Sequence, residues 1–393
     1  MSFLPFLRFA VVVLAAIALP VSAFSQTTGG LAAQRLQFAP LPIPVDVKSH
    51  ASGERRHWVR YEQCQIQFDV SLDKSIWIPM VADAGAQEAK IGRCVRTAIQ
   101  EHADVLILPE VASAIPQPAR ARVFEMLAST ARSAHMLIIA GSFYDDGRRS
   151  RIAYFGPNWT ELGFKIRPSR FEVSPIAGHG MVEGDSILLL QTEFGNIAAI
   201  TCVDLISDAV QASIRRLIDE RRLDVLVNIN YNPASWEFLI EANSLARRHP
   251  VFVSITNAVP SPGGYSAATC KPATNEDDGY CYGHSAIFSS MNANYGSDDL
   301  GDDLVPDAFL MPGKPPQNAQ PAGVGGAPAP TAVKKPIQKQ LAYSYLVADT
   351  GTFRERALIY DLNMQLPRLA ADTTAPDQGY PTIRNVKIRD LAP

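Results

Sequence analysis

The sequence predicts an α/β protein with mixed parallel and antiparallel strands, because its apolar runs are joined in two different ways. Helical patterns link the strand-like runs at residues 103–108 and 136–140, so these strands can lie parallel. Within residues 151–201 the strand-like runs follow one another with turns between them, and short turns require antiparallel neighbours. Within residues 223–257 a helical pattern again connects two strand-like runs. The two kinds of connection together indicate mixed pairing.

Hydrophobic periodicity and turn residues define the individual elements. Apolar residues at helical spacing predict helices at residues 87–102, 119–135 and 236–248, and Ser207 and Asp208 open a further helix. Short apolar runs predict strands at residues 64–70, 75–80, 103–108, 136–140, 151–155, 161–167, 186–191, 196–201, 223–230, 251–257, 283–288, 341–348 and 357–362.

Changes in composition divide the chain of 393 residues into segments. A tract rich in Pro, Ala and Gly cannot build a core, so it predicts a disordered insertion. The spaced aspartates before it lack EF-hand spacing, which favours a solvated loop over a calcium site. The expected segments are a signal peptide at 1–23, an N-terminal arm at 24–57, a main domain at 58–296, the insertion at 297–340, closing strands of the same domain at 341–367, and a C-terminal tail at 368–393.

The amino terminus is typical of an export signal. Arg8 supplies a positive charge, residues 9–19 form an apolar run, and small residues before Phe24 provide a cleavage site. An uncleaved anchor is the alternative, but a spanning helix needs roughly 20 apolar residues. We therefore expect a periplasmic or extracellular protein without a stable membrane span. The net charge is −3, so the sequence lacks the excess of Lys and Arg that is typical of proteins that bind nucleic acid. Nucleic acid is therefore not an expected partner.

Export changes how the five cysteines are interpreted, because an oxidising compartment permits disulfides. Cys270 and Cys281 bracket a polar loop and are the favoured pair. Cys94 lies on the apolar stripe of a predicted helix, so a buried free thiol explains it at least as well as a bridge with Cys64. A cysteine left over, such as Cys202, indicates a reactive thiol.

Cys202 follows the apolar run at residues 197–201 and precedes a predicted helix. A thiol at such a turn is expected to be partly exposed and close to a helix N-terminus, which favours the thiolate. That position suits a nucleophile. The alternative is a small core residue at the end of a buried strand.

Two other predicted strands end in ionisable side chains. Glu110 follows the run at residues 103–108, and Lys165 lies in the run at residues 161–167. Strands of one sheet end along a common edge, so these side chains and Cys202 can converge there. Taken singly, Lys165 is better explained as a surface lysine and Glu110 as a helix-capping carboxylate.

Three blocks of sequence carry these residues: Leu108-Pro109-Glu110, Gly163-Phe164-Lys165, and Phe194-Gly195 with Thr201-Cys202-Val203-Asp204. In this order they resemble the three blocks of the carbon-nitrogen hydrolase (nitrilase) superfamily, and the similarity covers roughly residues 64–289. The resemblance implies a four-layer α-β-β-α sandwich of two mixed β-sheets and a homodimer or higher homo-oligomer. We expect no metal, because the sequence has no His-Glu-x-x-His motif and no paired Cys-x-x-Cys, and no organic cofactor.

The resemblance also implies a role for each site residue. Cys202 would attack the substrate carbonyl and form a thioester, with Glu110 as the general base. Lys165 and the backbone N–H of Val203 would stabilise the oxyanion. Amidases of this superfamily carry a second carboxylate that positions the substrate, and Glu172 matches its place.

Two alternatives near that second carboxylate stay open. Glu183 competes with Glu172 for the same role, because the spacing from the lysine is close to the family's without deciding between them. His179 lies between glycines in the intervening loop, and we interpret it as a polar loop residue rather than a catalyst.

Together these features predict an exported thiol amidase that acts on a small-molecule amide. Nitrilases of the superfamily usually have Trp-Glu directly after the nucleophile, and Val203-Asp204 stands here instead, which argues against a nitrile substrate. A nitrilase or an N-acyltransferase remains an alternative on the same scaffold. A catalytically silent exported binding protein is the alternative from another class.

Overall fold

The computed structural model describes residues 42–51, 53–232, 235–259, 282–289, 346–350, 354–365 and 383–391. All of them belong to one compact unit, residues 40–393. The expected signal peptide, the insertion at 297–340 and the favoured pair Cys270 and Cys281 lie outside the described residues.

The described residues form two seven-stranded sheets, and both are mixed as the sequence predicted. In the first sheet, β10, β11 and β12 run parallel, β9 pairs antiparallel with β10, and β13 pairs antiparallel with β12. Its strands, in spatial order, are β1 (Val45–Ser49), β9 (Ile187–Thr192), β10 (Gly195–Thr201), β11 (Val225–Asn230), β12 (Phe252–Asn257), β13 (Ala286–Ser289) and β14 (Leu346–Asp349).

The second sheet has a parallel centre formed by β2, β5 and β6, with antiparallel strands on both sides. A separate two-stranded hairpin joins β3 (Val70–Asp73) and β4 (Ile78–Val81). The strands of the second sheet, in spatial order, are β16 (Ile383–Asp390), β15 (Arg356–Asn363), β2 (Trp58–Gln65), β5 (Val105–Ile107), β6 (Leu137–Tyr144), β7 (Ser150–Phe155) and β8 (Thr160–Phe164).

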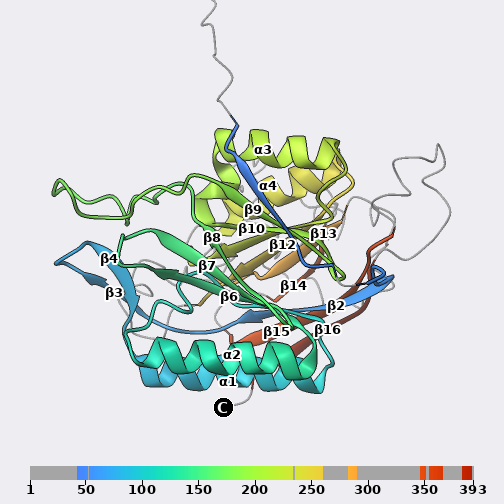
Figure 1. Ribbon diagram of the computed structural model, residues 1–393, viewed down its shortest axis with the longest axis horizontal. Helices are drawn as coiled ribbons and strands as arrows, with labels where there is room; N and C mark the ends of the chain where they lie inside the picture. The colour runs from blue at the N-terminus through green and yellow to red at the C-terminus, as the bar shows by residue number, and fades with distance from the viewer. Residues whose placement is uncertain are drawn as a thin grey trace, which may run out of the picture. The chain divides into compact units, whose positions relative to one another are not determined.

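Four helices cover the outer faces of the sheets and complete the expected four-layer sandwich (Figure 1). The pair α1 and α2 packs on the second sheet, and α3 and α4 pack on the first. They are α1 (Ala84–Gln100), α2 (Ala119–Ala134), α3 (Asp208–Asp219) and α4 (Ser235–Arg248), and a short 3-10 helix, η1 (Cys202–Ile206), precedes α3.

Three layers of buried side chains hold the sandwich together. Residues such as Ile107 and Val227 fill the space between the two sheets. The stripe on α1 that includes Ile91 packs against the second sheet, and the stripe on α3 that includes Ile214 packs towards the first. Each layer removes apolar surface from water, which is the main favourable term in folding.

A disulfide between Cys64 on β2 and Cys94 on α1 corrects the interpretation of Cys94 as a free thiol. Both side chains are fully buried, so the apolar stripe did place Cys94 inward. The spacing of apolar residues along α1 does not reveal which strand the helix packs against, and Cys64 lies on that strand, β2. Among the cysteines that the structure describes, Cys202 is the free one.

The expected arm and tail each contain a strand. Within 24–57, β1 pairs parallel with β9 at the edge of the first sheet. Within 368–393, β16 pairs antiparallel with β15 at the edge of the second. Edge strands are exposed on more sides than central ones, so their side chains carry a weak hydrophobic signal. In the described part of the chain, none of the helices combines the length and the apolar character needed to cross a bilayer.

Candidate active site

The three candidate residues lie directly beyond strand ends, but not all in one sheet as expected. Lys165 is the first residue after β8 and Glu110 follows β5 by three residues, both in the second sheet. Cys202 is the first residue after β10 in the first sheet. Because the two sheets are stacked, the site forms where strand ends of both sheets meet.

Lys165 lies between two carboxylates. Its Nζ donates to Glu110 Oε1 at 2.7 Å and to Glu172 Oε2 at 2.6 Å. The side chains of all three residues are buried, and Lys165 is only 1% exposed. Burial lowers the pKa of Lys165, but the two carboxylates outweigh it and hold that pKa well above its usual value. The amine is therefore a fixed positive charge.

The turn after β5 fixes the carboxylate of Glu110. The backbone N–H of Tyr231 donates to Glu110 Oε2 at 2.9 Å, so both carboxylate oxygens have a donor. The next residue, Val111, has a φ of 64°, which is rare for a β-branched residue, and its N–H donates to Ser142. Gly141 lies across this turn, where a Cβ would come within 2.2 Å of the Pro109 carbonyl oxygen.

Cys202 is buried rather than partly exposed, since 3% of the residue is accessible. The chain turns there into η1, and α3 begins only at Asp208, so the expected α-helix N-terminus is not at the sulfur. Its φ of 48° turns the backbone sharply out of the strand. Asn228 donates to the carbonyl of Cys202, and Asn232 Nδ2 donates to Sγ at 3.3 Å.

Burial and the neighbouring charges shift the pKa values of Cys202, Glu110 and Glu172 in different directions. Burial raises the pKa of Cys202, with Glu110 adding to the effect and Lys165 opposing it, so the resting group is a thiol. Burial also raises the pKa of Glu110, while Lys165 keeps the pKa of Glu172 below its usual value. Two carboxylates with opposite shifts suit different tasks, and Glu110 is the one able to exchange a proton.

Glu172, rather than Glu183, is the carboxylate that reaches Lys165. It accepts from the N–H of Ser169 at 2.7 Å and from the hydroxyl of Tyr144. Glu183 instead pairs with Arg167, and its side chain is 53% exposed. Within the described residues, no contact joins His179 to this cluster.

Asp204, two residues after Cys202, connects η1 to the segment that carries Lys165. Its carboxylate accepts from the N–H groups of Ile166 and Arg167 at 3.0 and 2.8 Å. Burial raises the pKa of Asp204 to about 7. The side chain thus links the turn that begins at Cys202 to the segment that follows Lys165, although the two segments leave strands of different sheets.

Four residues that contact the cluster or the segments beside it were not predicted from the sequence: Tyr144, Asp204, Tyr231 and Asn232. Tyr144 ends β6, and Asp204 lies inside the block that carries Cys202, so no separate pattern distinguishes either residue. A usable signal existed for Asn232, since Asn228, Asn230 and Asn232 alternate along one strand and its extension and therefore share a face.

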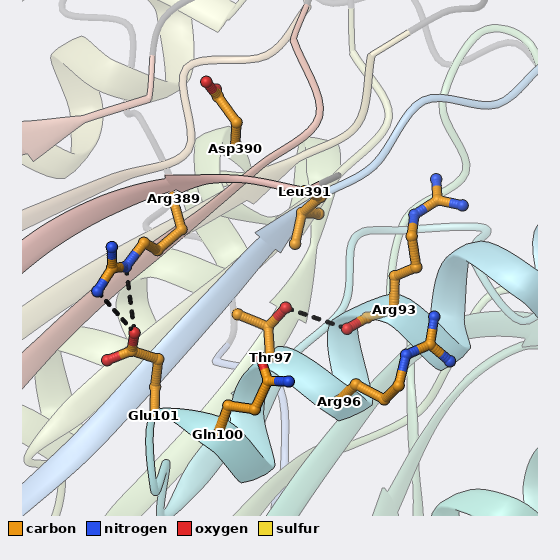
Figure 2. A pocket seen from close by; sticks show the side chains of 8 residues that line it. All are labelled: Arg93, Arg96, Thr97, Gln100, Glu101, Arg389, Asp390 and Leu391. Atoms are coloured by element: carbon orange, nitrogen blue, oxygen red, sulfur yellow. Dashed lines mark hydrogen bonds and ion pairs between the residues drawn. The ribbon is translucent and has the colours of Figure 1, made fainter. Parts of the chain in front are cut away.

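A separate cavity of about 490 Å³ lies between α1 and β16, and none of these site residues lines it (Figure 2). Two of its lining residues form an ion pair, in which Glu101 accepts from Arg389. The described part of the chain gathers no group of three side chains suited to a metal ion. The cavity is lined by Arg93, Arg96, Thr97, Gln100, Glu101, Arg389, Asp390 and Leu391.

No protein-family model and no curated protein matches the sequence, but solved structures match the fold. A CN-hydrolase superfamily protein from Xanthomonas campestris, solved with an arsenic adduct in its active site, aligns with 83% of this chain and 98% of its own, at 12% identity and a TM-score of 0.50. An amidase from Nesterenkonia sp. aligns with 61% of this chain and 86% of its own, at 13% identity and a TM-score of 0.44. The first of these matches, together with the two stacked sheets, shows that the chain has the nitrilase-like α-β-β-α fold.

Proposed function

We propose that this chain is a thiol amidase that hydrolyses a non-peptide carbon-nitrogen bond in a small molecule. The observation that carries the proposal is the cluster around Lys165. A buried ammonium lies between Glu110 and Glu172, and its charge acts on the sulfur of Cys202. Buried charges are costly unless they are paired, and a cluster with shifted pKa values is typical of a catalytic site.

The first half of the reaction forms an acyl-enzyme. Cys202 gives its proton to Glu110, and Sγ attacks the carbonyl carbon of the amide. The charge of Lys165 and the N–H of Val203, at the start of η1, stabilise the oxyanion. When the C–N bond breaks, Glu110 returns the proton to the leaving amine, and a thioester remains on Cys202.

The second half releases the acid. Glu110, again ionised, takes a proton from a water molecule as that water attacks the thioester carbonyl. The C–S bond then breaks, and the sulfur recovers its proton from Glu110. Glu172 keeps Lys165 in place throughout, since its lowered pKa keeps it ionised while Glu110 changes state.

The test is Cys202→Ala assayed beside the wild type on a panel of small amides and nitriles. Ammonia or amine release should fall by roughly a thousand-fold or more, because the covalent path is lost. Intact mass spectrometry of the wild type should detect the acyl group on Cys202. Turnover that survives Cys202→Ala would show that the triad assignment is wrong.

The same assay separates the alternatives. Transfer of the trapped acyl group to an added amine rather than to water would select an N-acyltransferase, and turnover of nitriles alone would select a nitrilase. Wild-type protein that neither turns over nor acquires an acyl group across the panel would select the silent binding protein.

We also propose that the protein is exported, to the periplasm or the extracellular space. The support is the signal-like sequence at residues 1–23, together with the Cys64–Cys94 disulfide. Structural disulfides persist in oxidising compartments and are rare in the cytosol.

A further inference from the structure

Adjacent residues at the end of β11 contact both reactive groups of the cluster. The backbone N–H of Tyr231 donates to Glu110 Oε2 at 2.9 Å, and the side-chain amide of Asn232 donates to Cys202 Sγ at 3.3 Å. The carboxylate and the thiol come from different sheets. This one dipeptide therefore connects the proposed base to the proposed nucleophile.

Asn232 is itself held by a second asparagine. The N–H of Asn232 donates to Asn257 Oδ1 at 3.1 Å, and Asn257 Nδ2 donates back to the carbonyl of Asn232, also at 3.1 Å. Asn257 is 1% exposed and ends β12, which pairs with β11. Its amide also donates to Ser235 at the start of α4. The backbone that carries the Asn232 amide is thus fixed by two strands and a helix.

We propose that Asn232 is a positioning residue whose amide orients the Cys202 sulfur and stabilises its thiolate. A hydrogen-bond donor to the sulfur favours its charged form, which the rest of the cluster supports only weakly. Lys165 makes its hydrogen bonds to the two carboxylates, and burial works against the charged form of the sulfur. An amide does not titrate, so its donor is present at every pH at which Glu110 changes state.

The inference rests on the proposed function, but its test does not need a substrate. The rate at which iodoacetamide alkylates Cys202 in the full chain, followed by peptide mapping across a pH series, reports the thiolate. The variants are Asn232→Ala, which deletes the donor, and Asn232→Asp, which keeps the size and replaces the donor with a carboxylate. Asn158→Ala, at an exposed position in the β7–β8 turn, is the matched control.

We expect both Asn232 variants to move the alkylation profile to higher pH. At a fixed pH below the wild-type midpoint the rate should fall roughly ten-fold, as expected when one hydrogen bond to a charged group is lost. Asn232→Asp should show the larger shift, because it adds a negative charge beside the sulfur. On any amide that the wild type hydrolyses, kcat should fall with KM little changed.

Unchanged alkylation profiles in both variants, equal to that of Asn158→Ala, would overturn the inference. Asn232→Asp guards against a folding artefact, since it preserves the side-chain volume and its thermal unfolding can be compared with that of the wild type. The two proposals fail separately. A wild type that hydrolyses no amide contradicts the amidase proposal and leaves the alkylation comparison valid, whereas an active wild type with unchanged variant profiles contradicts only the role of Asn232.

Discussion

At the scale of single residues, the site depends on two carboxylates that contact the same lysine but have pKa values shifted in opposite directions. Lys165 bonds to both, and the hydroxyl of Tyr144 bonds to Glu172 from the other side. Burial and the charge of Glu172 raise the pKa of Glu110, while Lys165 opposes the rise. In the mechanism that we propose, Glu172 therefore acts through Lys165 and Glu110 rather than by direct chemistry.

The substitution Glu172→Gln tests this arrangement. It removes a like charge from the neighbourhood of Glu110 and leaves Lys165 paired with Glu110 alone, and both changes lower the pKa of Glu110. A general base acts in its ionised form, so the acidic limb of the profile of kcat/KM against pH should move to lower pH. Glu183→Gln, which changes the competing exposed carboxylate, is the control and should leave the profile in place. A limb that stays or moves upwards would contradict this role.

At the scale of elements, the side chains of the site are positioned by sharp turns just beyond the ends of strands. The chain turns sharply at Val111 and Cys202, and both residues adopt a positive φ. Such conformations cost of order 1–3 kcal/mol each and persist only where the surroundings enforce them. In the sheet that carries Glu110 and Lys165, the Cys64–Cys94 disulfide ties β2 to α1.

Replacing both half-cystines by alanine should destabilise the fold without altering the sulfur of Cys202. The disulfide closes a loop between positions 30 residues apart, and a loop of that length corresponds to roughly 3.6 kcal/mol of stability. Urea unfolding of Cys64→Ala/Cys94→Ala beside the wild type measures the loss. The alkylation rate of Cys202 in the folded variant serves as the control. A variant as stable as the wild type would show that the disulfide does not brace the fold.

At the scale of the whole molecule, the sandwich brings together residues that no single sheet could bring together. Glu110 and Lys165 reach the site from the second sheet, and Cys202 and Asn232 reach it from the first. The fold is shared with a CN-hydrolase superfamily protein at 12% identity, so the architecture tolerates almost complete replacement of its sequence. A fold kept at such low identity does not determine the substrate, because function depends on the residues of the site.

Export is the prediction that belongs to the whole chain. When the full sequence is expressed with its own amino terminus, intact mass spectrometry of the exported fraction should find a protein that begins after Ala23, with Cys64 and Cys94 oxidised. A variant with Arg8→Glu, which reverses the charge of the n-region, should reduce processing. Recovery of the uncleaved chain in the cytoplasm, with both thiols reduced, would contradict the proposal.

The sequence by itself determined the fold class and most of the elements, but not the edge strands β1 and β16. The apolar stripe of α3 and the buried run of β10 are local patterns, and local patterns can be read along the chain. The positions at strand ends made Glu110, Lys165 and Cys202 candidates, and the resemblance supplied a role for each. The structure places Glu110 and Lys165 in direct contact.

Only the tertiary structure decided which sheet each strand enters, how deeply Cys202 is buried, and which carboxylate meets Lys165. It also paired Cys64 with Cys94 and showed β1 and β16 at the sheet edges. The physical reason is the same in each case. Strand pairing, burial and contacts across the sandwich depend on residues dozens of positions apart, whereas hydrophobic periodicity reports only which face of its own element a residue occupies.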